Sequence, residues 1–496
     1  MRHRGRTARR LTIAGVLALA MLTGGIVVNP ASGGWEKAGG GWGRAGGGCG
    51  QRCALVPAVG YAPPPGGRAP AGWVGARLPG GVAGGAAGPV LGVIGYKPAV
   101  VARLDPRTLR PLPGPRLTLP YGVSGHLWSP DRERLVLGDL DDDALYVIDP
   151  VRLRRLATIR FGIVAASSQE LVWLGPRRLA AVAGDPADGS TLVLADPVAG
   201  RVLSRRRLAP AGIRAFGAGD RLVLLHTPVE QMAAARLSVV DDRGRMRTVQ
   251  LAGVRAGFQS PPDWGRPGAY GVMRDPALAV DPVGRPPGRA FVIAGGDTIA
   301  EVDLATLQVT YRRLRQPASL LRRLAHWLVP PAEAKLVAGT WRSACWLGEE
   351  TLAVWGGDNS VTGDSPATQR VHQRPSGIRL IDTRTWTIRP LDPAAPTGSW
   401  QAGRLLAFGG TWDDEAQRQR GVGGTLYRPG DRRPRHVLGN RAVDDAHLNG
   451  ELLYASVDSG GEVSGRMVVA LRTGRVLSSS DEPLPYLLLD DPGRTC

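Results

Sequence analysis

Carboxylates are the chemically active side chains that recur most often in the turns of this chain. Asp139, Asp141 and Asp143 stand in one short acidic run, and closely spaced carboxylate oxygens are the ligands that calcium prefers. The run lacks the glycine and the distal glutamate of an EF-hand loop. Aspartate also starts tight turns by accepting backbone N–H groups. Calcium is therefore the candidate metal, a plain turn is the alternative, and no cofactor is predicted as a requirement.

A second set of candidates combines acids with tryptophans in long insertions. Trp264 and Trp412 offer flat apolar faces that stack on a sugar or another planar ligand, although a tryptophan also plugs a loop against the strands beneath it. The candidate ligand-binding residues are Asp263, Trp264, Asp358, Asp364, Trp412, Asp413 and Asp414.

The histidines do not form a recognisable catalytic motif. They are scattered without the spacing of a metal pair, and no Gly-x-Ser-x-Gly, P-loop or His-Glu-x-x-His sequence is present. His126 and His447 lie on predicted inner strands, where they either approach a central channel or serve as buried structural residues. Because catalytic groups of a repeat fold come from different repeats, the catalytic residues are unknown and the sequence leaves catalysis undecided.

The N-terminus has the order of an export signal. Several arginines precede an apolar run over residues 11–28, and small residues follow, as in secretory signal peptides. We interpret residues 1–33 as a signal peptide and expect an extracellular or cell-surface protein. The apolar run is also about long enough to span a bilayer, so an uncleaved membrane anchor is the alternative.

The four cysteines fit an oxidising compartment, where disulfides persist. Their number is even, and of the three pairings we favour Cys49–Cys53 with Cys345–Cys496. The first pair lacks the further cysteines or histidines that a closed zinc site needs. The cysteines are therefore predicted to form disulfides rather than to bind metal.

Composition separates a linker from a folded region. Residues 34–88 are rich in Gly, Ala and Pro and cannot bury enough surface to offset chain entropy, which predicts a disordered linker. Residues 1–98 also carry about half of the formal net charge of +19. The remainder is mildly basic, mostly through arginine, so we expect no specific nucleic-acid partner.

Short apolar strands recur from about residue 89 to residue 490. Partner strands close on an aspartate, as at Asp149 and Asp303. The strands are apolar on both faces, so both faces must be covered. Radially stacked four-stranded sheets provide that cover, and a spacing of about 45 residues is typical of propellers. The sequence thus predicts an all-β fold, with one β-propeller over residues 89–490 and a C-terminal tail over 491–496.

The repeat also resembles known propeller families. Leu145-Tyr146-Val147-Ile148-Asp149 and Thr298–Thr306 look like the segment of YVTN-type repeats, and Trp128-Ser129-Pro130-Asp131 is similar to TolB-like propellers. The Trp-Asp ending of WD repeats is missing. The resemblance implies a fold and leaves function open, because such propellers include lactonases, quinone-dependent dehydrogenases, receptors and scaffolds.

Seven whole repeats can be counted, and residues 89–118 form an incomplete further unit. Residues 486–489 could supply its missing innermost strand, which would join the two chain ends. We therefore predict seven or eight four-stranded blades and a closed ring.

Four long insertions interrupt the repeat at residues 253–275, 315–340, 357–376 and 409–424. Antiparallel alternation places all four on one face of the ring, and loops of such length are usually functional or disordered. Within them, residues 317–329 are predicted to form one short amphipathic helix, because Pro317 suits a first turn and leucines with Trp327 form one stripe. The helix docks on the propeller or lies in a membrane interface.

We expect an exported and monomeric propeller that binds a protein or a cell-envelope polymer through the face with the insertions. The first alternative is an enzyme, either a metal-assisted, lactonase-like hydrolase or a quinone-dependent dehydrogenase. The second is a scaffold held at a membrane through residues 11–28 or 317–329.

Overall fold

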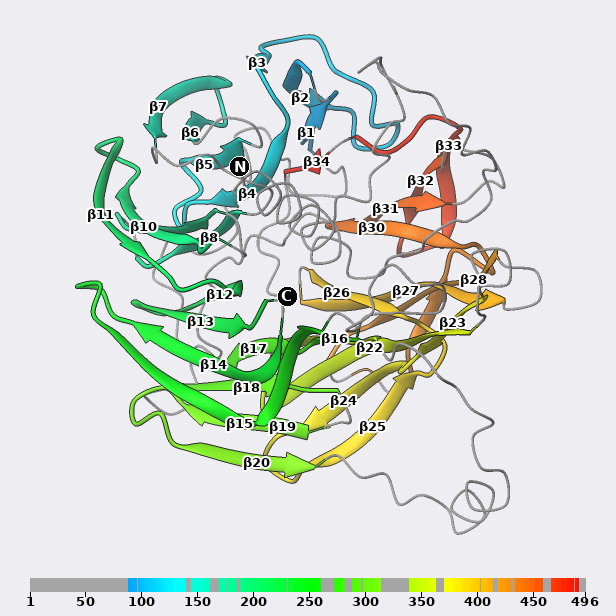
Figure 1. Ribbon diagram of the computed structural model, residues 1–496. Coiled ribbons are helices and arrows are strands. Elements are labelled where there is room, and N and C mark those ends of the chain that lie inside the picture. The colour runs from blue at the N-terminus through cyan, green and yellow to red at the C-terminus, as the bar shows by residue number, and fades with distance from the viewer. Residues whose placement is uncertain are drawn as a thin grey trace, which may run out of the picture.

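The computed structural model describes residues 88–489, apart from residues 96, 140–143, 161–168, 176, 185–187, 230, 260–271, 282–287, 296–297, 314–338, 363–369, 402, 414–417, 430, 432, 458–464 and 486. Within this part every regular element is a β-strand, and the strands form six four-stranded sheets and one ten-stranded sheet. The sheets stand around a central axis as in a β-propeller (Figure 1). The predicted all-β class and propeller arrangement are confirmed.

Five of the four-stranded sheets are each built from four strands that follow one another in sequence, from the innermost strand to the outermost. Their strands are β4 (Val123–Trp128), β5 (Leu135–Asp139), β6 (Ala144–Asp149) and β7 (Arg154–Arg160); β8 (Gln169–Trp173), β9 (Leu179–Ala183), β10 (Thr191–Asp196) and β11 (Arg201–Arg207); β17 (Ala277–Asp281), β18 (Arg289–Ile293), β19 (Thr298–Asp303) and β20 (Val309–Arg313); β26 (Thr397–Gln401), β27 (Arg404–Asp413), β28 (Arg418–Tyr427) and β29 (Arg435–Val437); and β30 (Val443–Asn449), β31 (Leu452–Val457), β32 (Gly465–Ala470) and β33 (Arg475–Ser480).

The sixth four-stranded sheet joins the two ends of the described chain. It contains β34 (Leu487–Leu488), β1 (Val90–Ile94), β2 (Ala99–Leu104) and β3 (Leu117–Leu119). Gly92 pairs with Leu488 and Val93 with Leu487 in antiparallel register. The predicted closure of the ring by residues from the C-terminal end is confirmed.

The ten-stranded sheet contains two sets of four strands and two additional strands. The first set is β12 (Gly212–Ala218), β13 (Arg221–Thr227), β14 (Met232–Val240) and β15 (Met246–Gln259), and the second is β21 (Gly339–Gly348), β22 (Thr351–Thr362), β24 (Ile378–Asp382) and β25 (Thr387–Asp392). Strand β16 (Val272–Asp275) is antiparallel to β15 and parallel to β21, and β23 (Arg370–Pro375) pairs with β22. The expected seven or eight separate blades are not confirmed as stated, because β16 fuses two sets of strands into one sheet.

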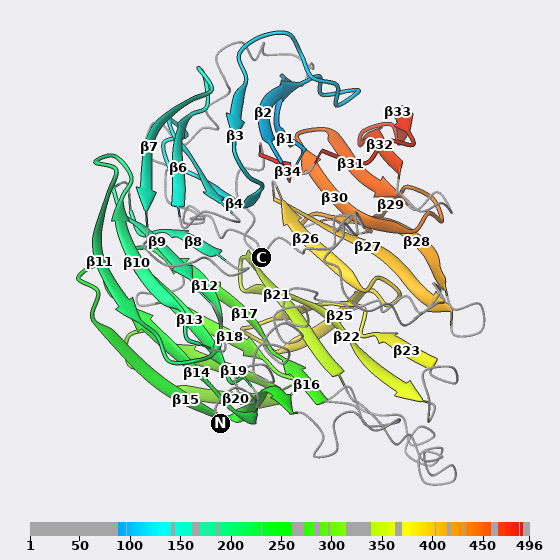
Figure 2. The same cartoon turned by 45° about the horizontal axis from the view of Figure 1, so that its top comes forward.

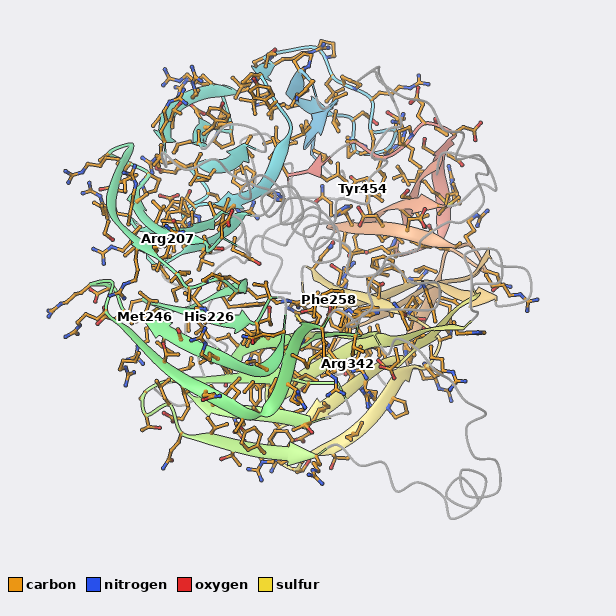
Figure 3. The ribbon with its side chains drawn as sticks, in the orientation of Figure 1. Arg207, His226, Met246, Phe258, Arg342 and Tyr454 are labelled. Atoms are coloured by element: carbon orange, nitrogen blue, oxygen red, sulfur yellow. The ribbon has the colours of Figure 1, made fainter. Side chains whose placement is uncertain are left out.

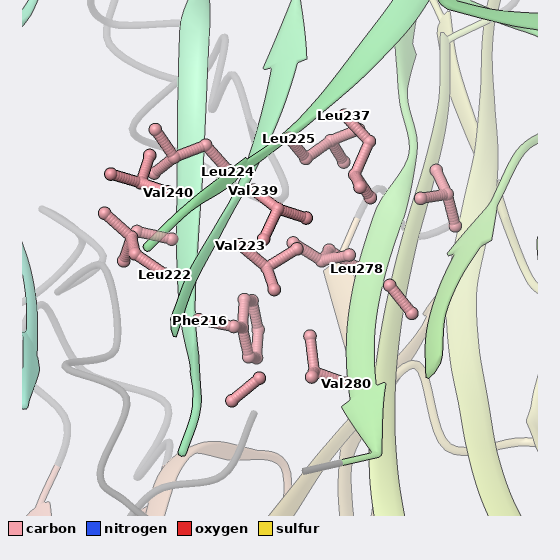
Figure 4. Packing of buried hydrophobic residues seen from close by; sticks show 14 of the residues in the cluster. Phe216, Leu222, Val223, Leu224, Leu225, Leu237, Val239, Val240, Leu278 and Val280 are labelled. Carbon is pink, nitrogen blue, oxygen red and sulfur yellow. The ribbon is translucent and has the colours of Figure 1, made fainter. Parts of the chain in front are cut away.

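The hydrophobic core lies between neighbouring sheets. One cluster packs Phe216, Leu222 and Val223 against Leu278 and Val280 of β17 (Figure 4). Other clusters fill the remaining gaps around the ring, including the gap between β32 and the closing sheet, where Val468 meets Val90 and Leu488. Strands that are apolar on both faces, such as β6 and β9, are buried throughout. This arrangement explains why the strand sequences do not alternate.

Aspartates organise the turns between third and fourth strands. In each case one carboxylate oxygen accepts backbone N–H groups shortly downstream; the examples are Asp105, Asp149, Asp196, Asp241, Asp303 and Asp382. Burial raises the pKa of Asp303, but hydrogen bonds from Thr306 and Ala305 outweigh it and hold the pKa below its ordinary value. The predicted role of aspartate in these turns is confirmed.

Several predicted segments lie outside the described residues. They are the signal peptide, nearly all of the linker, the C-terminal tail and the inserted helix at residues 317–329. Within the described ranges there is no helix, and none of the length and apolarity needed to cross a bilayer was found there.

Candidate functional site

The four insertions meet on one face of the ring. The end of β15 pairs with β16, β16 pairs with the start of β21, and the far ends of β22 and β23 pair with each other. Strand β23 also contacts β27, whose end pairs with the start of β28. Parts of three predicted insertions therefore belong to one hydrogen-bonded sheet beyond the blades, and the fourth, in the β27–β28 hairpin, lies beside it (Figure 2). We call this sheet together with that hairpin the extension sheet.

Glycines mark the points where blade strands become the extension sheet. Gly356 has φ +143°, and a Cβ there would lie 2.2 Å from the carbonyl oxygen of Trp341. Gly423 has φ +68°, and a Cβ would lie 1.8 Å from the carbonyl oxygen of Gly439. Both backbones need a conformation and a close approach that only glycine allows. The sequences Trp355-Gly356-Gly357 and Phe408-Gly409-Gly410 repeat this arrangement in two sheets.

Charged side chains of alternating sign lie on the strands β8, β12, β16, β21 and β22. We call the set formed by Glu170, Arg214, Asp275, Arg342 and Asp358 the axial charge row. Glu170 lies near the start of β8, and Arg214 near the start of β12 donates from Nη2 to Oδ2 of Asp275. The Arg214 and Asp275 side chains are 33% and 27% exposed, so solvent reaches the middle of the row.

Glu170 has the most perturbed carboxyl group of the row. Its side chain is buried, and burial raises its pKa to about 8, although the charge of Arg214 and the backbone N–H of Ala215 both lower it. The carboxyl therefore keeps its proton at neutral pH. A carboxylic acid with a pKa near the working pH can donate a proton or hydrogen-bond a ligand as a neutral group.

The row continues into the extension sheet through β16 and β21. Asp275 is the register partner of Trp341, which precedes Arg342. Arg342 is buried, and its Nη1 lies 3.0 Å from Oδ1 of Asp358 and donates to the carbonyl oxygens of Trp341 and Gly357 at 2.9 Å. Figure 3 labels Arg342 and Phe258 on the side of the ring where these strands meet. The ion pair fixes the base of the extension to the inner strand.

The opposite inner strands carry polar groups that are bonded within the ring. His447 on β30 places Nε2 2.9 Å from Oδ2 of Asp445, and both His447 and His126 of β4 are buried. Gln401 on β26 donates from Nε2 to Ser399 Oγ at 2.7 Å, and its Oε1 accepts the backbone N–H of Leu448. The predicted inner-strand positions of both histidines are confirmed, and the contact of His447 with Asp445 fits a structural role.

The predicted site residues are only partly described. Asp358 is exposed and pairs with Arg342. Asp139 ends β5 opposite Val123, and Trp412 and Asp413 lie in the extension of β27 opposite Gln419 and Arg418. The contact between β23 and β27 brings the Asp358 hairpin beside the Trp412 hairpin. The residues outside the described part are Asp141, Asp143, Asp263, Trp264, Asp364 and Asp414.

The metal and disulfide predictions remain predictions. In the part of the chain that the structure describes, no group of three or more His, Cys, Asp or Glu side chains is placed to hold a metal ion. Cys345 on β21 is fully buried and packs in a core cluster with residues of neighbouring strands. Cys49, Cys53 and Cys496 lie outside the described residues, so the pairing of the four cysteines is not tested.

Sequence reasoning missed Glu170, Arg214, Asp275 and Arg342. A signal was present, because each is a charge within or directly before an inner strand that is otherwise apolar or small, as in Gln169-Glu170-Leu171-Val172. Their proximity depends on the order of inner strands around the axis. The order of the inner strands around the axis is known only from the three-dimensional structure.

Comparisons with known proteins support the fold of this chain and identify no family for it. No protein-family model and no curated protein matches it. Solved structures similar to it include the dihydro-heme d1 dehydrogenase NirN in complex with DHE, with 13% identity, a TM-score of 0.48, and coverage of 79% of this chain and 72% of that chain.

Two further structures are similar over most of their length. Apo AztD from Citrobacter koseri has 11% identity and a TM-score of 0.44, with coverage of 81% of this chain and 96% of that chain. The Dos1 propeller has 10% identity and a TM-score of 0.42, with coverage of 73% and 85%. The chain shares a propeller arrangement with such proteins, and these similarities carry no argument about its ligand or activity.

Proposed function

We propose that this chain is an exported β-propeller that binds a protein or a cell-envelope polymer through the extension sheet. The observation that carries the proposal is the joining of three separate insertions into one hydrogen-bonded sheet, with the fourth beside it. Insertions that served only to connect blades would have no need to pair with one another. The N-terminal export signal and the even number of cysteines support a location outside the cytoplasm.

The extension sheet suits a large ligand better than a small one. It runs from β15 over β16 and β21 to β22 and β23 and reaches β27, and therefore crosses several blades. Extended surfaces of this kind match the area that a macromolecular partner buries. Exposed Asp358 at its base and the hairpin with Trp412 and Asp413 are the positions that we propose contact the partner.

We also propose that the ten-stranded sheet works as two blades that β16 holds together, which gives the ring eight four-stranded units. Its two sets of strands each repeat the antiparallel order of a separate blade. The fusion stiffens the base of the binding face, because β16 hydrogen-bonds the outermost strand of one set to the innermost strand of the other.

Shortening two hairpins tests the binding role. In one variant residues 360–372 are replaced by Asn-Gly between Asn359 and Gln373, which are register partners; in the other, residues 412–419 are replaced by Asn-Gly between Thr411 and Arg420. We expect both variants to keep the melting temperature and to lose co-sedimentation with isolated cell envelopes of the producing organism by tenfold or more.

A variant with an unrelated surface change serves as the control. Val476 is 43% exposed on β33, away from the extension sheet, and Val476→Ser should bind envelopes as the parent does. Full binding by both shortened hairpin variants, with folding intact, would refute the proposed surface.

Glu170 favours one second candidate function, a propeller enzyme. A buried acid with a pKa of about 8 beside a partly exposed Arg214 is the arrangement of a general acid. Lactone hydrolysis and quinone-linked oxidation are the reactions to assay, with and without added calcium. Activity that Glu170→Gln abolishes without loss of folding would support the enzyme. Activity that Glu170→Gln leaves intact would exclude this role for Glu170.

The calcium proposal for Asp139, Asp141 and Asp143 has its own test. Elemental analysis of the purified protein, with melting curves before and after chelation, should show bound calcium and a lower melting temperature on its removal. A metal-free protein that is indifferent to chelators would end that proposal. The same preparation tests the membrane-anchored scaffold. If residues 11–28 are retained, the measured mass of the mature protein will include them.

A further inference from the structure

Two neighbouring outer strands carry a dense set of exposed arginines. Strands β7 and β11 contact each other, and Nη2 of Arg205 donates to the carbonyl oxygen of Arg160 at 3.2 Å. Both strands lie on the circumference of the ring, remote from the extension sheet (Figures 1 and 2). The exposed arginines of the two segments are Arg152, Arg154, Arg155, Arg160, Arg201, Arg205, Arg206 and Arg207. We call this surface the basic flank.

The two segments that form the flank are purely basic in sequence. Residues 151–160 and 198–207 contain no acid. Asp149 pairs with Arg152 and Arg154. In contrast, Arg206 and Arg207 donate to the carbonyl oxygens of Gly244 and Asp188, and such bonds orient a guanidinium without cancelling its charge.

The basic flank also collects exposed apolar side chains. The exposed large hydrophobic residues of the described chain are Val151, Leu156, Val198, Leu203, Tyr311 and Val476, and the first four of them belong to the flank. Leu156 and Leu203 are 44% and 42% exposed. Arginine and exposed leucine therefore coincide on the same two strands.

A matched position elsewhere in the ring shows that this exposure is specific to the flank. Leu156 and Leu203 each occupy a register shift, where the outer strand has one residue more than its neighbour. Leu477 has the equivalent place on β33, yet it packs against a core cluster. The same bulge thus packs a partly buried leucine against the core on one blade and presents an exposed leucine on each of the two blades of the flank.

We propose that the basic flank docks on an anionic lipid surface. Arginines attract acidic headgroups, and exposed leucine and valine side chains enter the boundary between headgroups and acyl chains. A single-stranded nucleic acid is disfavoured, because such ligands stack on aromatic side chains and none of the exposed flank residues is aromatic. A duplex would use the arginines alone, whereas a lipid surface also uses the exposed leucine and valine side chains. The flank would hold the ring edge-on to the membrane and leave the extension sheet free for its own partner.

Vesicle binding of the full chain tests this proposal. We compare vesicles of phosphatidylglycerol and phosphatidylcholine with vesicles of phosphatidylcholine alone, and follow amide exchange in β7 and β11. Each basic residue near an anionic surface contributes about 1 kcal/mol, or roughly fivefold in partitioning. The double variant Arg201→Gln/Arg205→Gln should lower binding to the anionic vesicles by about 25-fold and abolish protection of both strands.

Matched variants distinguish vesicle binding by this surface from binding caused by the overall positive charge or by the N-terminal apolar segment. Arg472→Gln/Arg475→Gln removes the same charge from the exposed end of another blade and should change binding less than twofold. Leu156→Ser/Leu203→Ser should weaken binding at high salt, where apolar contacts persist. Equal losses in the two arginine pairs, absence of protection in β7 and β11, or binding of soluble nucleic acid instead of vesicles would overturn the proposal.

Discussion

The two halves of the ring have similarly packed cores but present different surfaces to solvent. Between β4 and β11 each sheet has four strands, and the outer strands face solvent with arginine and leucine. Between β12 and β28 the strands β15, β21, β22, β27 and β28 lengthen beyond the blades, and β16 and β23 are added, whereas β17 to β20 form an ordinary four-stranded sheet. Clusters of aliphatic and aromatic residues fill the gaps between sheets in both halves.

The difference shows that the packed interfaces between sheets are shared around the ring, whereas the surface features differ from one half to the other. Packing between sheets is similar everywhere because each sheet buries both faces. The surfaces that we propose bind partners lie where the repeat is interrupted, at the glycine-marked extensions in one half and at the exposed bulge residues in the other. Substitutions in the core should therefore act alike in both halves, whereas substitutions at the interruptions should act locally.

The largest expected effect is on the core. Phe291 is fully buried and stacks on Trp346 at 5.5 Å between ring centroids. Phe291→Ala should lower the free energy of unfolding by about 3–5 kcal/mol, because it removes apolar contacts and leaves a cavity. Denaturant titration measures the loss. Leu145→Ala in the other half should cost about 2–5 kcal/mol, and a negligible cost there would show that the two halves are not equivalent.

Glu170, at the border of the halves, should give a loss of stability with rising pH. Its folded pKa of about 8 lies above its ordinary value. The protonated form therefore stabilises the folded chain fully below the ordinary pKa, and this contribution disappears as pH rises through about 8. Glu170→Gln should remove that dependence and be more stable than the parent at pH 9, by roughly 4 kcal/mol. Parallel stability curves for parent and variant from pH 5 to pH 9 would contradict the assignment.

The extension sheet should depend on its glycines. Gly356→Ala places a Cβ against the carbonyl oxygen of Trp341 at a positive φ and should cost about 2–4 kcal/mol or detach the β22–β23 hairpin. Gly219→Ala is the control, because its φ is +66° but nothing lies within 4 Å of the added Cβ; it should cost about 1–2 kcal/mol. Amide exchange in β23 distinguishes detachment from global loss.

The smallest effect is expected at the shared turns. Asp303→Ala removes the acceptor of the Ala305 and Thr306 backbone N–H groups and should cost about 1 kcal/mol. Because the pKa of Asp303 is held below its ordinary value, its contribution is present at neutral pH and is lost as pH falls through the folded pKa. Thermal melts at pH 7 and pH 3 should differ less in the variant than in the parent.

Much of the fold is readable from local sequence. The apolar strands, the aspartate turns and the closure by residues near 488 all follow from short-range pattern, because each repeat uses the same local chemistry. The fusion through β16 is not readable. Its four residues carry no strand pattern, and they pair with Thr340 and Trp341, which lie far away in sequence.

The candidate site was predictable only in outline. Insertion lengths and strand alternation located the face that carries Asp358 and Trp412. Glu170 acquires its raised pKa from burial beside β12, and Arg342 meets Asp358 because β21 and β22 pair in antiparallel register. Both facts depend on three-dimensional neighbours and on burial that no single segment encodes.

Hydrogen exchange of the extension sheet tests the central account most directly. The amides of Arg274, Asp275, Thr340, Asn359 and Gln373 should exchange slowly, at rates near those of the outer blade strands, because they belong to one hydrogen-bonded sheet. Exchange of these amides at the rate of exposed loops, while the blades stay protected, would show that the insertions do not form a common surface.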